Sequence, residues 1–358
     1  MIRDFDPASF ISPLKLRRVD TVGRMALACT RLLFEDAGCT PDAGGRDDVG
    51  IALGTATAGL DSLVEYLAGL VDHGPTGVPA ILFSNTVSNA PASLCAIEYG
   101  LRGPNVTFNQ REASSLSALT YGVGAIRDGR ASAMVTGGAD CIEETFFKVH
   151  DRFGGLSPGR RPNRHGEKAR PFDRDRNGFV LGEGAFLLLL ESTTAAAARG
   201  ARCYGEFLGV GASASPTRLN DWPSNADGPM SAMRMALEDA SVRPDEIAAV
   251  IGAANGSPVL DRIEVDAITS VFGTSMPVVS IKGAIGESGA SGAAGIITGL
   301  LSHARGCVAP THGFCTLDPA VAIHASSQPH SATGSTFLVN SIASGGANYS
   351  AVVRAVSA

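Results

Sequence analysis

The chain has 358 residues, 44% of them hydrophobic, which is enough for two globular domains or one large duplicated domain with a sizeable core. Its formal net charge of -6, without a long run of lysines and arginines, argues against nucleic acid or an anionic membrane surface as the main partner. Since the sequence shows neither an apolar stretch long enough to span a membrane nor an N-terminal signal pattern, we expect a cytoplasmic protein that binds a small molecule or another protein.

Apolar, β-rich runs alternate with helical patterns along the chain, which is typical of α/β architecture with sheets covered on both faces. The predicted strands, in chain order, are 49–54, 105–109, 132–138, 185–191, 247–253, 278–282 and 335–340. Apolar residues recur at helical spacing in 60–71 and again in 112–126, so both segments are predicted helices. The second helix is rich in small residues, including Gly122 and Gly124, and we expect it to be a central helix packed on several sides.

Two short segments indicate an internal duplication. VTGGAD at 135–140 ends an apolar run in the first half, and ASGGAN at 343–348 follows one in the second half. An alanine-rich stretch at 194–202 lies between them. We therefore predict two similar halves, 1–195 and 196–358.

Five sequence blocks carry a resemblance to a known family. They are GLRGPNV at 100–106, FGGLS at 153–157, RPFDRDRNGFVLGEGA at 170–185, IKGAIGESGASGAAG at 281–295 and NSIASGGAN at 340–348. In order and spacing they resemble the β-ketoacyl-acyl-carrier-protein synthases, which are condensing enzymes of the thiolase fold. The resemblance implies an α/β thiolase fold, in which duplicated βαβαβ halves form five layers (αβαβα), and dimerisation through the middle of the first half.

The residues that carry catalysis in that family are replaced in this chain. The family's nucleophile is a cysteine thiolate at the N-terminus of the central helix, where the helix dipole lowers its pKa. This position falls on Glu112, whose carboxylate is a poor acyl acceptor because it would form a labile anhydride. The two family histidines correspond to Asn255 and Glu287, and none of the seven histidines lies at either position.

One further catalytic position matches the family pattern, and two other segments depart from it. Lys282 matches the family's active-site lysine, but without catalytic partners we expect it to pair with Glu287 or Glu112 in a structural role. The loop that carries two gating phenylalanines in the family reads Ile342-Ala343-Ser344, so the gate is not preserved. Family members usually open with an apolar strand, whereas this chain opens with MIRDFDPASF, which leaves open that the first sheet lacks its N-terminal strand.

A ketosynthase scaffold without its nucleophile and histidines resembles the chain-length factors, the β subunits of type II polyketide synthases. The resemblance implies a non-catalytic subunit that forms a heterodimer with an active ketosynthase and shapes the tunnel for a polyketide or polyene delivered by an acyl carrier protein. The tunnel wall is expected within 78–89, at Val78, Ile81 and Leu82. The alternative for each of these three residues is ordinary core or interface packing.

No cofactor or metal is expected. The seven cysteines are odd in number and include no CxxC pair, so neither a disulfide framework nor a zinc site is indicated. Two alternative functions stay open. One is a malonyl decarboxylase that primes synthesis, although Glu112 and Glu287 would add negative charge where an enolate needs hydrogen-bond donors. The other is a structural or carrier-docking protein, because Arg160 and Arg161 within 157–164 could attract an acidic carrier protein.

Overall fold

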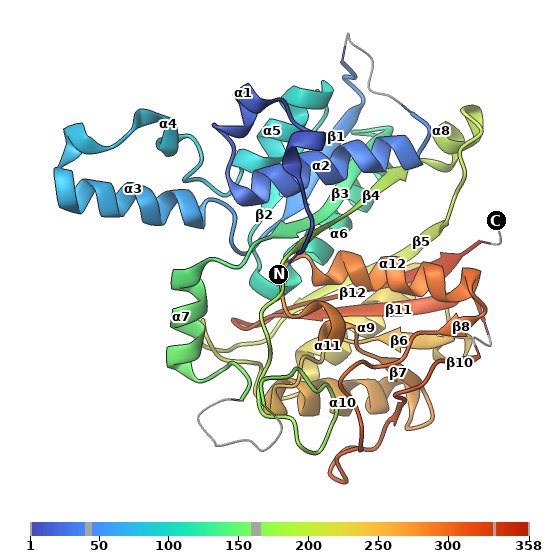
Figure 1. The fold of residues 1–358 in the computed structure, drawn as a ribbon. Coiled ribbons are helices and arrows are strands. Elements are labelled where there is room, and N and C mark those ends of the chain that lie inside the picture. The colour runs from blue at the N-terminus through green and yellow to red at the C-terminus, as the bar shows by residue number, and fades with distance from the viewer. Residues whose placement is uncertain (1, 40–44, 159–165, 332–333, 357–358) are drawn as a thin grey trace.

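The computed structural model of the protein describes residues 2–39, 45–158, 166–331 and 334–356. Two large β-sheets lie one above the other in the view of Figure 1, and helices cover and separate them. No helix within these ranges is long and apolar enough to cross a membrane.

The first half of the chain contributes one sheet and the helices around it. Its strands are β1 (Val49–Gly54), β2 (Asn105–Phe108), β3 (Ala133–Asp140) and β4 (Gly184–Glu191). Its helices and short 3-10 turns are η1 (Pro7–Ser9), α1 (Pro13–Leu16), α2 (Thr21–Asp36), α3 (Leu60–His73), η2 (Pro75–Gly77), α4 (Ala80–Phe83), α5 (Ala90–Tyr99), η3 (Arg111–Ala113), α6 (Ser114–Arg127), α7 (Glu144–Phe153) and α8 (Thr193–Ala198).

The second half contributes a larger sheet and a small two-stranded one. Its strands are β5 (Gly205–Ala214), β6 (Ala249–Ile251), β7 (Pro277–Val279), β8 (Cys307–Val308), β9 (His324–Ala325), β10 (His330–Ser331), β11 (Thr336–Ile342) and β12 (Ala347–Ala355). Its helices and 3-10 turn are α9 (Asp227–Ala240), η4 (Pro244–Glu246), α10 (Pro258–Phe272), α11 (Lys282–Ile285) and α12 (Ser291–Ala304).

The two large sheets repeat one strand order. In the first sheet the order is β2-β1-β3-β4, where β1 is parallel to β2 and β3, and β4 is antiparallel to β3. In the second sheet the run β7-β6-β11-β12 has the same order and the same strand directions. The sheet topology therefore has the duplication that the thiolase resemblance implies.

Two strands of the second sheet, β5 and β9 at its two edges, have no counterpart among the strands of the first. The last strand of the repeat, β12, pairs with β11 on one side and with β5 on the other. Its equivalent β4 pairs only with β3 within the described parts of the chain. At this edge the first sheet therefore has one strand fewer than the second. This is the edge at which the N-terminal strand expected from the family resemblance would pair.

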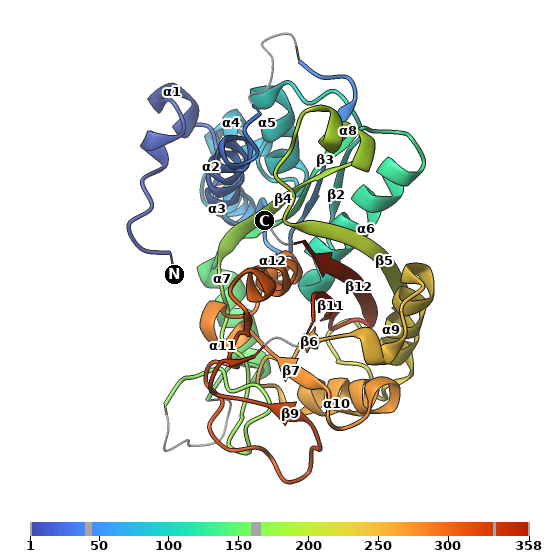
Figure 2. The same cartoon turned by 90° about the vertical axis from the view of Figure 1, so that its right-hand side faces the viewer.

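Helices and sheets stack in five layers (Figure 2). On the outer face of the first sheet, α2 and α5 pack against β1, β3 and β4. Between the sheets lie α6 and α12, where Leu116, Leu119 and Ile296 are fully buried; each such side chain stabilises the fold by about 1.5–3 kcal/mol. The fifth layer is formed by α9 and α10, which cover the second sheet. The expectation that α6 is a central helix is confirmed.

Most predicted elements occur in the structure, with shifts at their ends. The segment 49–54 coincides with β1, and 60–71 lies within α3. The predicted strands 247–253 and 278–282 shorten to the three-residue strands β6 and β7, because the chain leaves the sheet there to form the loops of the site described below. The prediction missed β5, β12 and the two-residue strands β8, β9 and β10. The small residues of β5 and β12 carry little β propensity, and these segments are strands because they pair with each other along their length.

Candidate functional site

Glu112 lies at the point where the chain passes from the first sheet into the central helix. It belongs to η3, between β2 and α6. The preceding residue, Arg111, has a φ of 51°, a left-handed conformation that is uncommon for a residue with a side chain. The backbone N–H of Ser115 donates to the carbonyl of Gly289 at 2.8 Å, which joins this turn to the loop before α12.

The Glu112 carboxylate binds the C-terminal loop that carries the gate in the related family. The backbone N–H of Ser344 donates to Glu112 Oε2 at 3.0 Å, and the Ser344 hydroxyl lies 3.1 Å from both carboxylate oxygens. Arg111 Nη1 donates to the same Ser344 hydroxyl at 3.0 Å, and Arg111 Nη2 donates to Asn220 Oδ1 at 2.7 Å. Glu112 and Arg111 together therefore hold the loop against η3.

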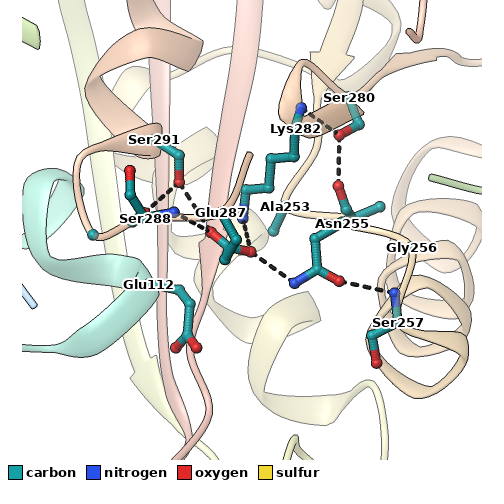
Figure 3. A network of polar contacts seen from close by, with 12 residues as sticks. Glu112, Ala253, Asn255, Gly256, Ser257, Ser280, Lys282, Glu287, Ser288 and Ser291 are labelled. Carbon is teal, nitrogen blue, oxygen red and sulfur yellow. Dashed lines mark hydrogen bonds and ion pairs between the residues drawn. The ribbon is translucent and has the colours of Figure 1, made fainter. Parts of the chain in front are cut away.

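The other three predicted site residues meet in one buried network (Figure 3). Lys282 Nζ forms an ion pair with Glu287 Oε2 at 2.8 Å, and Asn255 Nδ2 donates to the same oxygen at 2.7 Å. The second oxygen, Glu287 Oε1, accepts hydrogen bonds from the Ser291 hydroxyl at 3.2 Å and from the Ser288 N–H at 3.1 Å. Of the two partners expected for Lys282, the structure has Glu287.

Buried carboxylates fix the loop that carries Asn255. Asp261 Oδ1 accepts from the N–H groups of Asn255 and Gly256 at 3.0 and 3.1 Å. Glu264 accepts from the two preceding N–H groups, those of Ala253 and Ala254, at 2.7 and 2.6 Å. Both carboxylates come from α10, so one helix sets the position of the whole loop.

The run at 170–185 positions Glu287 through the main chain. The Glu287 N–H donates to the carbonyl of Val180 at 2.7 Å, and the Gly182 N–H donates to the carbonyl of Glu287 at 2.9 Å. A β-carbon at Gly182 would lie 2.1 Å from the carbonyl oxygen of Ile285, so only glycine permits this approach. The block at 170–185, which carries part of the family resemblance, thus holds Glu287 in place through main-chain hydrogen bonds.

The surroundings of Glu112 raise the pKa of its carboxyl group. Burial, followed by the nearby Glu287 carboxylate, raises the pKa of Glu112 to about 7. Lys282 and the Ser344 hydrogen bonds lower it by less. Figure 3 shows Glu112 beside the Lys282–Glu287 network, and no dashed contact joins it to that network.

The arrangement offers little of what acyl transfer requires. The hydrogen-bond partners described above for Glu112, Asn255, Lys282 and Glu287 include neither a cysteine nor a histidine. The side-chain donors of Lys282 and Asn255 are both directed at Glu287, as is the Ser291 hydroxyl. The site is therefore a closed hydrogen-bonded network rather than a nucleophile with its activating base.

The predicted tunnel residues lie away from this network, on an arm formed by α3 and α4. Val78 and Leu82 are partly exposed, Ile81 is exposed, and none of the three belongs to a hydrophobic core cluster of the described residues. Packing in the core of this chain, one of the alternatives, is therefore wrong for them. The arginines considered for carrier docking, Arg160 and Arg161, lie outside the described residues.

Several residues of the site were not predicted from the sequence. The sequence indicates Ser344 only as part of a lost gate, and it gives no site role to Arg111, Asn220, Asp261, Glu264, Ser288 or Ser291. Ser344 is 232 positions from Glu112 along the chain, so no local pattern connects them. The one available signal was the replacement of a bulky gate residue by a small hydroxyl residue opposite a carboxylate.

The duplicated five-layer fold defines a protein of the condensing-enzyme class. The model of the β-ketoacyl synthase N-terminal domain matches residues 1–196, and that of the C-terminal domain matches residues 204–315. The chain belongs to the β-ketoacyl synthase family.

Individual relatives are similar over most of the chain. The 3-oxoacyl-(acyl-carrier-protein) synthase 2 of Vibrio harveyi is 29% identical over 99% of this chain and 87% of its own length. The tetracenomycin polyketide synthase ketoacyl synthase alpha subunit of Streptomyces glaucescens is 32% identical over 88% of this chain and 76% of its own length. Among solved structures, the ishigamide ketosynthase/chain length factor superimposes with a TM-score of 0.90 at 30% identity, covering 99% of this chain and 86% of that one.

Proposed function

We propose that the protein is a non-catalytic, chain-length-factor-like subunit that pairs with an active ketosynthase and shapes the tunnel in which a polyketide or polyene is extended. The observation that carries this proposal is the pairing of Lys282 and Asn255 with Glu287, next to a Glu112 that binds Ser344. The side chains at the family's catalytic positions are engaged in this ion pair and these hydrogen bonds within the chain. Such a site needs a partner to supply a thiolate and histidines.

Similarity to solved complexes supports the choice of partner. The ishigamide structure is described as a ketosynthase/chain length factor, and a second similar structure, 26% identical, is described as a type II acyl carrier protein in complex with its ketosynthase. By analogy, the partners proposed for this chain are a catalytic ketosynthase and an acyl carrier protein. Val78, Ile81 and Leu82 on the α3–α4 arm are proposed to line the tunnel across the interface.

The site gives no support to malonyl decarboxylation. An enolate that develops on loss of carbon dioxide needs hydrogen-bond donors directed at it. Here Lys282 Nζ and Asn255 Nδ2 are both directed at Glu287 Oε2, and two carboxylates share the site. Mass spectrometry of malonyl carrier protein incubated with this chain alone should show no acetyl carrier protein.

Co-expression with the ketosynthase from the native host tests the proposed function. We expect a 1:1 complex, product formation that needs both subunits, and near wild-type turnover when this chain carries Glu112→Ala. The matched control is alanine in place of the partner's catalytic cysteine, which should abolish turnover. Loss of all product with Glu112→Ala in an intact complex would show that Glu112 takes part in the chemistry.

A further inference from the structure

Two histidines lie side by side at an edge of the second sheet, and the proposed function gives them no role. His324 begins β9, the edge strand that pairs with β7, and His330 begins β10, which pairs with β8 in the small two-stranded sheet. Their ring centroids are 5.7 Å apart, with an angle of 33° between the ring planes. The two rings therefore meet between strands that belong to different sheets.

His330 is the member of the pair whose polar atoms lack partners. Its ring nitrogens, Nδ1 and Nε2, are both shielded from solvent, and neither has a hydrogen-bond partner among the described residues. A neutral imidazole has one N–H donor and one acceptor nitrogen, so either tautomer leaves both groups unsatisfied. Because nearly all buried polar groups in proteins are satisfied, a ring in this state indicates a ligand from outside the chain.

The surroundings of His330 suit it to bind a cation. Burial, followed by the neighbouring His324, lowers the pKa of His330 from its ordinary value. The ring is therefore neutral at pH 7, and a neutral imidazole offers the lone pair that a metal ion binds. His324 is exposed, so its ring can turn toward the same ion.

The spacing of the two rings fits one shared ion. Zinc and similar ions bind imidazole nitrogens at about 2.0–2.1 Å, which places two rings on one ion with centroids about 4.5–5.5 Å apart. The distance of 5.7 Å between the centroids of His324 and His330 is just above this range. A small rotation of the exposed His324 side chain would bring both rings onto one ion.

The backbone holds both histidines in place before any ion binds. His324 is fixed by the pairing of β9 with β7, and His330 is paired with the buried Val308 of β8. Between them, the Ser326 hydroxyl donates to the carbonyl of Gln328 at 2.8 Å and accepts from the Gln328 N–H at 3.0 Å. Such a preformed backbone lowers the entropic cost of bringing two ligands to one ion.

We infer that His324 and His330 together bind a divalent transition-metal ion of the Zn²⁺, Ni²⁺ or Cu²⁺ class, which joins β9 to β10. Imidazole nitrogens select these ions over Mg²⁺ and Ca²⁺, which prefer oxygen ligands. Within the described ranges, no group of three or more histidine, cysteine, aspartate or glutamate residues could hold a metal, so water completes the coordination. Neither histidine belongs to the Lys282–Glu287 network, and the metal site is independent of the proposed function.

Isothermal titration calorimetry of the purified chain, first stripped of metal with EDTA, tests this site with Ni²⁺ as the probe. Wild type should bind one Ni²⁺ that neither His324→Gln nor His330→Gln binds, because each variant removes one of the two ligands. The matched control is His73→Gln, which removes an exposed histidine from α3 and should bind Ni²⁺ as wild type does. Mg²⁺ should give no heat of binding to any of these proteins.

Thermal denaturation gives a second readout, because an ion that binds only the folded chain raises the midpoint of unfolding. Ni²⁺ should raise the midpoint of wild type and of His73→Gln, and EDTA should reverse the rise. The midpoint of His324→Gln should not respond to Ni²⁺; since His324 is exposed, this variant separates the loss of a ligand from a loss of folding. A wild-type chain that binds no Ni²⁺, or that binds it no more tightly than both ligand variants do, would overturn the inference.

Discussion

Glu112 carries a proton in the folded protein over a pH range in which an ordinary glutamate is ionised. Its pKa is raised from 4.5 to about 7, first by burial and then by the Glu287 carboxylate. Between these two values the folded chain holds a proton that the unfolded chain has released. The free energy of unfolding contributed by this group therefore falls as the pH rises through that window.

Glu112→Gln should remove this pH dependence. The amide keeps the shape of the side chain and has no charge to bury, so the variant should gain stability relative to wild type as the pH rises from 4.5 to 7, by roughly 2 kcal/mol in all. Chemical denaturation of both proteins at several pH values across this window measures the difference between their free energies of unfolding. The contributions of other titrating groups are common to both proteins and cancel in this difference. Parallel stability curves would show that Glu112 titrates normally.

Replacing only one partner of the Lys282–Glu287 ion pair should destabilise the protein strongly. Both side chains are buried, so Lys282→Met leaves an uncompensated carboxylate and should lower the free energy of unfolding by about 3–5 kcal/mol. The double variant Lys282→Met/Glu287→Gln removes both charges, keeps an acceptor for Asn255 and should recover most of that loss. Urea denaturation of the four proteins in the cycle measures the coupling; additive losses would contradict it.

At the scale of elements, close main-chain contacts fix the short helix that presents Lys282. A β-carbon at Gly283 in α11 would lie 1.9 Å from the carbonyl oxygen of His312, whereas one at Gly124 in α6 would meet nothing within 4 Å. Gly283→Ala should therefore displace α11 and destabilise the protein by about 1–3 kcal/mol. Gly124→Ala is the control and should be stabilising by up to about 1 kcal/mol. Thermal denaturation compares them, and equal midpoints would contradict this reading of α11.

The elements also show how far sequence patterns reach. Local patterns are enough to predict β1, a short apolar run that is buried along its whole length, and α3, whose apolar residues recur at helical spacing although only Ser62 of this helix is buried. By contrast, β5 and β12 contain many glycine, alanine and serine residues, and they are strands because nine pairs of residues hold them side by side. Pairing partners so far apart in the chain leave no local signal.

At the scale of the whole molecule, the arm should change most when a partner binds. Its exposed apolar side chains lie outside the core of this chain, so its backbone amides should exchange readily in the isolated protein. Hydrogen-exchange mass spectrometry of the complex with a ketosynthase should show slower exchange in α3 and α4. Exchange in α9, which covers the far side of the second sheet, should stay the same. Slowing in α9 without slowing in the arm would place the interface elsewhere.

The sequence by itself determined the family architecture and predicted that the family's catalytic residues are replaced, because ordered blocks such as 170–185 and single positions such as Glu112 can be read along the chain. Only the tertiary structure decided that Lys282 pairs with Glu287 and that Glu112 holds Ser344. It also decided that the apolar residues of the arm stay outside the core. The physical reason is that burial and hydrogen bonding depend on groups that folding brings together from distant parts of the chain.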